Sequence, residues 1–202
     1  MNRFLAMGLT LLVAGPAGCL EAGGNGVSFK LGDDAPLFQD LPGIDGKKHS
    51  LGDFKQDVLV LCVTCNHCPV AAAYEERLIN FTKKYASGQD ARVAFVAVSV
   101  SDMEVDNLDK MKTRAKASGF NFPYLHDPTQ RLGKQLNAHV TPEFYVFDKS
   151  RKLVYWGAMD DDMDVAKVKE HYLAPAVEAV LANKAVAKAQ TKAFGCAVEF
   201  RK

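Results

Sequence analysis

Two apolar stretches mark the centre of a predicted sheet. Residues 58–63 are continuously apolar and residues 92–100 are rich in Val, which is typical of strands that are covered on both faces. Each stretch precedes a segment whose apolar residues have helical spacing, residues 70–85 and residues 105–118. Strands that alternate with helices predict an α/β protein with a central sheet between helices.

Shorter elements flank this centre on both sides. An Asp45-Gly46 turn between two alternating segments predicts an N-terminal β-hairpin. Downstream, spacing and turn residues predict a short strand, a short helix, a second hairpin and a final helix whose direction changes at Pro175. In that order they cover residues 121–125, 130–137, 143–148 with 153–157, and 165–182.

The first 22 residues have the order of an export signal. Arg3 precedes an apolar run and then a set of small residues that ends at Cys19. In a bacterial lipoprotein signal Cys19 would become the lipidated first residue, but Pro16 stands where such a signal usually has Leu. Cleavage near Ala22, which discards Cys19, is the alternative. Both interpretations predict a periplasmic or otherwise exported bacterial protein, held at a membrane only if Cys19 is lipidated.

Length and composition predict a single domain. We divide the chain into an export signal over residues 1–22, a Gly-rich linker over 23–34, one domain over 35–183 and a tail over 184–202 that carries Cys196. The chain is 48% hydrophobic and has a net charge of +1. Such a balance creates no field that would gather nucleic acid or acidic lipid, so neither is an expected partner.

The candidate chemistry lies where the first central strand meets its helix. Cys65 and Cys68 flank Asn66-His67, and side chains three residues apart in a helical turn are close enough to form a disulfide. The free N–H groups and the dipole of the helix start favour a thiolate at Cys65, the expected nucleophile, with Cys68 as resolving thiol. A protonated His67 would favour that thiolate further. Alternatively, His67 is exposed and has little influence.

Two further thiols leave alternatives open. Cys62 is favoured as a buried and inert residue, but with Cys65 and Cys68 it could form a copper or zinc site, with His67 as fourth ligand. A closed zinc site usually needs two CxxC pairs, and this chain has one. Cys196 is either a distant resolving or regulatory thiol or an unused one, since sequence separation does not give a distance.

Together these residues resemble the thioredoxin-fold redoxins grouped with alkyl hydroperoxide reductase and thiol-specific antioxidant proteins (AhpC/TSA). The resemblance runs from about Ala35 to the C-terminus, and its end looks like that of a peroxiredoxin-like subgroup. It rests on four segments: APLFQDLPGIDGKKHSLGDF, CNHCP after a strand, HVTPEFYVFD and TKAFGCAVEF.

The resemblance implies a thioredoxin-like fold, in which helices flank a central mixed β-sheet and the N-terminal β-hairpin is an extension. It also implies a cis peptide bond between Thr141 and Pro142 that lies beside the cysteine pair. The backbone groups of Thr141 and Pro142 would then be available to hold an extended substrate.

The peroxidase motif of that family does not fit this chain. The motif places Pro seven residues and Thr three residues before the attacking cysteine. Counting back from Cys68 gives Leu61 and Cys65, and counting back from Cys65 gives Val58 and Cys62. Fast peroxidase activity is therefore not expected.

The sequence thus predicts an exported thiol–disulfide oxidoreductase that acts through Cys65 and Cys68. Its expected partners are a protein or small-molecule disulfide or thiol substrate and an upstream thiol reductant or oxidant, and we expect no cofactor. One alternative is a peroxiredoxin-like antioxidant that reduces peroxides. The other is a copper- or zinc-binding accessory protein. The direction of electron flow and the identity of the substrate stay open.

Overall fold

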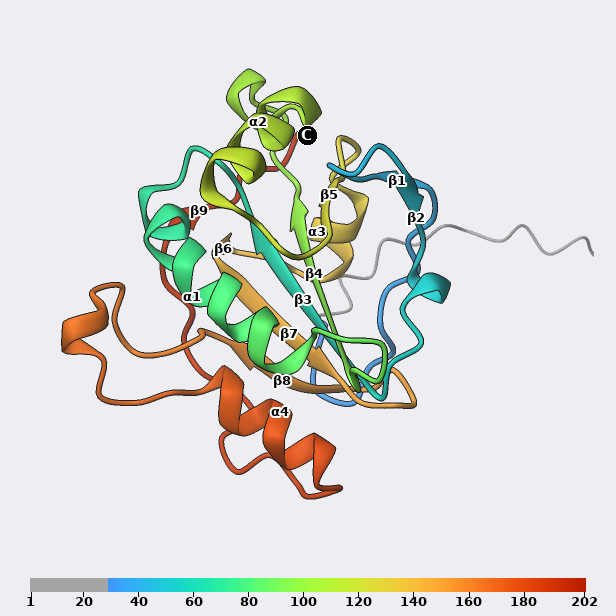
Figure 1. Ribbon diagram of the computed structural model, residues 1–202, viewed down its shortest axis with the longest axis vertical. Helices are drawn as coiled ribbons and strands as arrows, with labels where there is room; N and C mark the ends of the chain where they lie inside the picture. The colour runs from blue at the N-terminus through green and yellow to red at the C-terminus, as the bar shows by residue number, and fades with distance from the viewer. Residues whose placement is uncertain (1–28) are drawn as a thin grey trace, which may run out of the picture.

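The computed structural model describes residues 29–202 (Figure 1). The predicted export signal, its Cys19 and the first part of the predicted linker lie outside this range. Phe29 is buried in the core, and the Gly32 N–H donates to the Leu153 carbonyl at 2.8 Å. The described part of the expected linker therefore lies against the sheet. None of the helices within residues 29–202 has both the length and the apolar composition needed to cross a bilayer.

Five strands form the central sheet in the order β5-β4-β3-β7-β8. They are β3 (Val58–Thr64), β4 (Val93–Ser99), β5 (Tyr124–His126), β7 (Glu143–Phe147) and β8 (Leu153–Gly157). The first three run parallel, and β7 and β8 run antiparallel to their neighbours. β3 lies in the middle and all of its residues are buried, which explains its continuously apolar sequence. The predicted mixed central sheet is confirmed.

Successive residues of β3 face two different apolar layers. Leu59 and Leu61 face the N-terminal segment and α3, whereas Val60 and Cys62 face the opposite layer. That opposite layer is formed by α1, α2 and α4. The helices are α1 (Pro69–Tyr85), α2 (Leu108–Ser118), α3 (Arg131–Gln135) and α4 (Leu173–Leu181). Because successive side chains of a strand point to opposite faces of the sheet, β3 contributes to both halves of the core.

The N-terminal hairpin is present but short. β1 (Leu41–Pro42) pairs antiparallel with β2 (Lys48–His49). In the turn between them, Gly46 has a φ of +79°, a value that L side chains rarely adopt, and Asp45 accepts a hydrogen bond from the Lys47 N–H at 3.1 Å. The predicted hairpin extension is therefore confirmed.

The final helix begins later than the sequence predicted. Instead of one helix over residues 165–182, a single 3-10 turn η3 (Val165–Lys167) precedes a loop, and α4 begins at Leu173. Pro175 lies in the first turn of α4, where its missing N–H is not needed. Its ring would clash with the carbonyl of His171 in a longer helix, so the prediction of a continuous helix was wrong.

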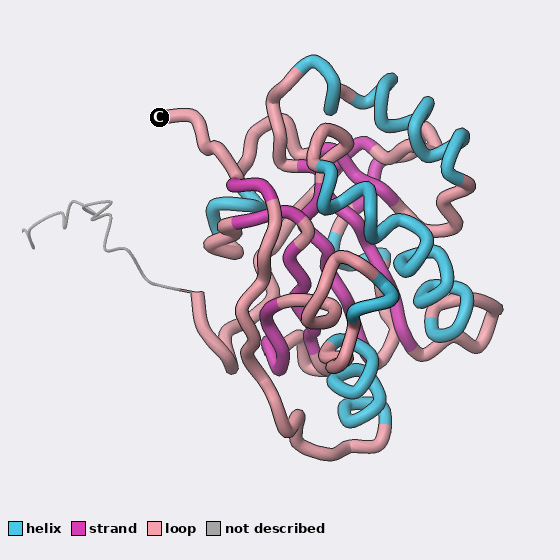
Figure 2. The backbone as a smooth tube through the Cα atoms, turned by 90° about the vertical axis from the view of Figure 1, so that its left-hand side faces the viewer, coloured by secondary structure: helices cyan, strands magenta, loops and turns pink. Residues whose placement is uncertain are grey.

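The tail runs back along the molecule to the edge of the sheet (Figure 2). Within it, β9 (Cys196–Ala197) pairs antiparallel with β6 (Val140–Thr141). Before β9, the Trp156 N–H donates to the Ala189 carbonyl at 3.0 Å. The tail is thus part of the folded body, while the boundaries that we assign to domain and tail stay predictions.

Candidate active site

The CNHC motif lies at the carboxyl end of the central strand. β3 ends at Thr64, Cys65 follows it directly, and α1 begins at Pro69. Open α/β sheets generally form their sites at this edge. The predicted junction of strand and helix is therefore where the two thiols lie.

Asp106 organises the loop that carries the motif. It belongs to the 3-10 turn η2 (Glu104–Asp106) after β4, and it is fully buried. One carboxylate oxygen accepts the backbone N–H of Asn66 at 2.6 Å and that of His67 at 3.2 Å. The other lies 2.5 Å from Nδ1 of His67. Sequence reasoning missed Asp106, although polar residues that follow two parallel neighbouring strands meet at one sheet edge.

Cys65 lies between His67 and Thr141. Its Sγ is 3.8 Å from Nε2 of His67 and 3.4 Å from Oγ1 of Thr141. Because Nδ1 of His67 faces Asp106, Nε2 is the nitrogen that faces the thiol. Thiol, imidazole and carboxylate thus lie in line, an arrangement that can serve as nucleophile, base and orienting group.

The Cys65 thiol is a weak acid in this environment. Burial raises its pKa to about 12, and the hydrogen bonds from Thr141 and the Cys68 N–H offset only part of that effect. The negative charge of Asp106 raises the pKa as well. At neutral pH Cys65 is therefore a thiol, and it needs a base to become a nucleophile.

The helix start favours Cys68 rather than Cys65. Cys68 is the N-cap of α1, and its Sγ accepts the Ala71 N–H at 3.3 Å. The prediction that the helix N-terminus favours a thiolate at Cys65 was wrong, because the first helical residue is Pro69 and Cys65 lies before the cap. Cys65 follows the strand, whereas Cys68 receives the free N–H groups.

The pKa of Cys68 reflects these contacts. Burial raises it, but hydrogen bonds from the Cys196 thiol, from Thr141 and from the Ala71 N–H outweigh burial and lower it below its ordinary value. As a thiol, Cys68 donates to the Thr141 carbonyl at 3.1 Å. The more acidic of the paired thiols is therefore the one that lies deeper.

The tail brings Cys196 to the same place. In the β6–β9 pair Cys196 is the partner of Thr141, and its side chain packs against Cys65 and Cys68. Burial raises the pKa of Cys196 to about 11, and its hydrogen bond to Cys68 contributes to that increase. Three thiols thus meet in one cluster, a contact that sequence separation could not predict.

Thr141 and Pro142 lie beside the thiols, as the resemblance implies. The bond between them is cis. The backbone of Thr141 is nevertheless occupied, since β9 pairs with it and Cys68 donates to its carbonyl. The backbone groups of Thr141 therefore already have partners within the chain, and a role of Thr141 and Pro142 in holding an extended substrate stays a prediction.

Cys62 is separate from this cluster. It is fully buried on the side of β3 that faces α1, where it packs among Tyr74, Phe95 and other apolar side chains. Burial raises its pKa far above the ordinary value, so it stays protonated and inert.

The alternative three-thiol metal site of Cys62, Cys65 and Cys68 is not assembled among residues 29–202. There, the group whose ligand atoms could hold one ion consists of Cys65, His67 and Asp106, with these atoms within 4.8 Å of one another. That group contains one thiol instead of three.

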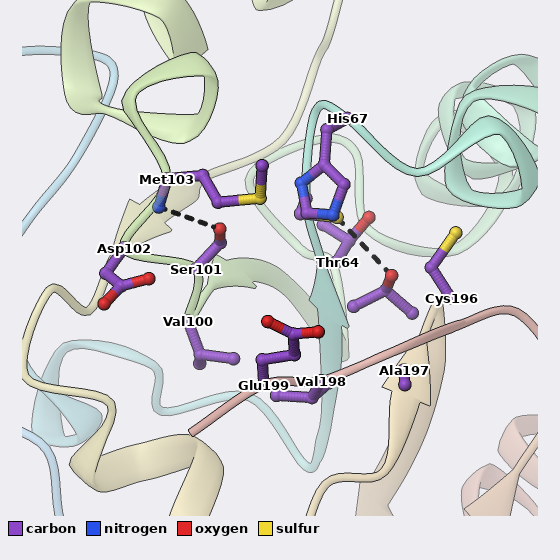
Figure 3. Close-up of a pocket in the computed structure, with 12 residues that line it drawn as sticks. Thr64, His67, Val100, Ser101, Asp102, Met103, Cys196, Ala197, Val198 and Glu199 are labelled. Carbon is purple, nitrogen blue, oxygen red and sulfur yellow. Dashed lines mark hydrogen bonds between the residues drawn. The ribbon is translucent and has the colours of Figure 1, made fainter. Parts of the chain in front are cut away.

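A pocket of about 360 Å³ opens beside Cys65 (Figure 3). Residues 100–103 after β4 form one wall, and residues 196–199 of the tail form the opposite one. Cys65, His67 and Thr141 line its base, whereas Cys68 does not reach it. The thiols that a bound molecule can contact are thus those of Cys65 and Cys196.

Comparison with solved structures identifies close relatives in shape. A conserved protein from Geobacillus kaustophilus is 33% identical, with a TM-score of 0.78 over 86% of this chain and 93% of its own. A hypothetical protein from Sinorhizobium meliloti 1021 is 34% identical, with a TM-score of 0.77 over 86% and 96%. Both are described as uncharacterised or hypothetical, so they carry no activity over to this chain.

More distant structures establish the fold class. Peroxidoxin BcpB from Mycobacterium tuberculosis is 20% identical, with a TM-score of 0.59 over 77% of this chain and 99% of its own. The fold is thioredoxin-like, as predicted. No curated protein matches the chain. The AhpC/TSA family matches residues 31–156. The chain with the CNHC site therefore belongs to the AhpC/TSA family of redoxins.

Proposed function

We propose that the protein is a thiol–disulfide oxidoreductase that works through Cys65 and Cys68. The observation that carries the proposal is the difference in access between the two sulfur atoms. Cys65 opens onto the pocket, whereas Cys68, three residues later, is fully buried beside the same Thr141. Thiol–disulfide exchange needs one sulfur that a substrate can reach and a second that can attack the first.

In the reductive direction Cys65 attacks first. Nε2 of His67, 3.8 Å away, takes the thiol proton, and Asp106 stabilises the imidazolium that forms. The thiolate bonds to one sulfur of the substrate disulfide, whose S–S bond breaks. The electron pair leaves with the other sulfur, which takes a proton and departs as a thiol. Cys65 is then part of a mixed disulfide.

Cys68 completes the exchange. Its lowered pKa favours the thiolate form next to the mixed disulfide, and that thiolate attacks the sulfur of Cys65. The second substrate thiolate leaves and takes a proton, and a Cys65–Cys68 disulfide forms. Two electrons have then passed to the substrate, and an upstream dithiol reductant returns the protein to its starting state.

Peroxide reduction is the second candidate, because Cys196 lies close enough to act on a sulfenic acid at Cys65 or Cys68. Oxidation of Cys65 by peroxide would give the sulfenic acid and water. Attack by a neighbouring thiol would then release a second water and form a disulfide. The mismatch with the peroxidase motif argues that this reaction is slow.

Trapping variants test the main proposal. Because Cys196 lies beside the pair, the trap is Cys68→Ser combined with Cys196→Ser. With bis(2-hydroxyethyl) disulfide, that variant should accumulate a mixed disulfide at Cys65, detected by mass spectrometry of the intact chain. Cys65→Ser should react far more slowly than wild type, and the buried Cys62→Ala serves as control. Equal rates for Cys65→Ser and wild type would remove Cys65 from the reaction.

We also infer that the protein works outside the cytosol, where disulfides can form and persist. The support is the order of residues 1–22, together with the Cys19 alternative. Cell fractionation of the full chain and of Cys19→Ala tests both points. Recovery of the wild-type chain in the cytosol would contradict export, and a Cys19→Ala chain that leaves the membrane fraction would show lipidation.

A further inference from the structure

We propose that this site takes small disulfides, and that the protein's own tail excludes extended polypeptides from it. The inference rests on the proposed disulfide exchange and specifies its substrate class. Four observations carry it: the pairing of β9, the anchoring of the tail on both sides of β9, the glycine at their closest approach, and the size of the pocket that remains.

First, β9 occupies the edge that an extended substrate would need. Val140 pairs with Ala197 and Thr141 with Cys196, so both residues of β6 already have strand partners. Next to this pair, the Val198 N–H donates to the His139 carbonyl at 2.9 Å. A peptide that binds by strand addition requires an unpaired edge. In this protein Cys196 of the tail lies next to Thr141, where a residue of an extended substrate would otherwise pair.

Second, the tail is anchored before β9. The Thr191 N–H donates to the Trp156 carbonyl at 3.0 Å. Its hydroxyl accepts the Ala158 N–H at 3.0 Å. A competing peptide would have to release these bonds before it reached the edge.

The tail is anchored after β9 as well. The side chain of Gln130 is fully buried and donates to the Glu199 carbonyl at 2.8 Å. In return, it accepts the Arg201 N–H at 2.8 Å. Both ends of the covering strand are therefore fixed to the body of the protein.

Third, Gly195 allows the tail to approach this closely. It has a φ of +152°, and a Cβ added to it would lie 1.9 Å from the carbonyl oxygen of Thr141. No side chain fits in that space, so any other residue at position 195 must move the tail or β6. The substitution Gly195→Ala, which adds one carbon atom, should therefore displace the tail from β6.

Fourth, the remaining opening suits a small molecule. The pocket beside Cys65 has a volume of about 360 Å³, and the tail itself forms one of its walls (Figure 3). Small-molecule sites typically measure roughly 300–1,000 Å³, which places this pocket at the lower end. A disulfide with short substituents can reach Sγ of Cys65 there, whereas a folded or extended chain cannot enter without displacing residues 196–199.

The test compares two substrates on the reduced full chain. Bis(2-hydroxyethyl) disulfide serves as the small substrate, and insulin with its disulfides intact serves as the polypeptide substrate. The rate of Cys65 consumption is measured for each. Wild type should react with the small disulfide and hardly with insulin. In Gly195→Ala the insulin rate should rise about tenfold or more, because the open state is no longer rare, while the small-disulfide rate stays of the same order.

Two further variants keep the test decisive. Gly88→Ala is the matched control, since Gly88 also has a positive φ, +91°, but open space around its missing Cβ. If Gly195→Ala does not fold, Thr191→Val loosens the tail instead by removing the hydroxyl that accepts the Ala158 N–H.

The outcomes separate the two proposals. A wild-type chain that consumes insulin disulfides as fast as the small disulfide would overturn the substrate class and leave disulfide exchange intact. An insulin rate that Gly195→Ala and Thr191→Val leave unchanged would overturn the role of the tail. A wild-type chain that reacts with neither substrate would remove the proposed function itself.

Discussion

The carboxylate of Asp106 fixes the imidazole of His67 so that its other nitrogen faces Cys65. Oδ2 lies 2.5 Å from Nδ1, and Oδ1 accepts the N–H groups of Asn66 and His67. Asp106 comes from a different strand end, about 40 residues along the chain from the motif. The orientation of the His67 imidazole is therefore set by the sheet, because β3 and β4 are parallel neighbours.

Asp106→Asn should slow the reaction of Cys65. An amide in this position still accepts the loop N–H groups through its oxygen, but it presents N–H instead of a carboxylate to Nδ1. The tautomer with a free Nε2 is then disfavoured, and the rate of Cys65 alkylation by iodoacetamide at pH 7.5 should fall about tenfold or more.

The matched control for that prediction is Asp109→Asn, which changes a highly exposed carboxylate on α2. It should leave the alkylation rate unchanged. A full pH profile separates chemistry from packing: loss of the base should lower the rate near neutral pH and leave the high-pH limit in place. Parallel profiles for wild type and Asp106→Asn would exclude the proposed role.

Cys68 and Cys196 should form a disulfide when Cys65 is absent. The side chain of Cys196 packs against the cluster that contains Cys68. In Cys65→Ser, mild oxidation with diamide should therefore join Cys68 to Cys196, and peptide mapping should show the link. Cys62, buried on the other side of β3, should remain free. A link between two chains, or a link to Cys62, would contradict this arrangement.

Stability should fall in alkaline solution. Burial raises the pKa of Cys65 from 9.0 to about 12 and raises that of Cys62 further. The native chain then binds more protons than the unfolded chain above pH 9, so the contribution of these thiols is complete below pH 9 and is lost as pH rises toward the folded-state values. The loss amounts to roughly 1 kcal/mol per pH unit for each thiol.

Denaturant unfolding at several values between pH 8 and pH 10 measures that slope. Cys62→Ala removes one of the two buried groups, so its free energy of unfolding should decline less steeply with pH than that of wild type, whatever its value at pH 7. Identical slopes would show that Cys62 does not titrate as described. Buried tyrosines such as Tyr155, whose pKa burial also raises, begin to add a loss of the same sign near pH 10, and they do so equally in wild type and Cys62→Ala.

A buried ion pair should dominate the stability of the region before α4. Asp160 is almost fully buried and accepts hydrogen bonds from Tyr74 at 2.6 Å and from Arg77 at 2.9 and 2.8 Å. Asp160→Ala leaves the Arg77 charge without its partner, which should cost roughly 3–5 kcal/mol of unfolding free energy. Glu170→Ala breaks the exposed pair with Lys188 and should cost far less.

Chemical denaturation of the two variants checks the comparison. If Asp160→Ala cost no more than Glu170→Ala, water would have to reach Arg77 in the variant, and the assignment of a buried pair would be wrong.

The centre of the fold was predictable because local sequence determines it. β3 has no polar residue before Thr64, and the CNHC motif follows it at once, so strand, thiols and helix could be located from the apolar run. The start of α4 was harder to predict from the sequence, although Pro175 indicates where the helix begins. This proline does not change the direction of a longer helix but limits how far α4 extends toward the N-terminus.

The site itself depends on contacts between distant segments. Asp106 reaches His67 because β4 is the neighbour of β3, and Cys196 reaches Cys68 because β9 pairs with Thr141. No local pattern encodes these two neighbourhoods. The acidity of the thiols depends on these contacts between distant segments. The sequence therefore predicted the favoured thiolate at Cys65, whereas the structure favours it at Cys68.

The position of β9 also affects how this protein can be divided for study. The part that matches the AhpC/TSA family ends at residue 156, before α4 and well before Cys196. A fragment cut at that boundary would keep the CNHC motif and the sheet but lose one wall of the pocket, the partner of Thr141 and a neighbour of Cys68. Its thiols would be exposed to solvent and to other polypeptides. The fragment would therefore react with a wider range of disulfides than the intact protein.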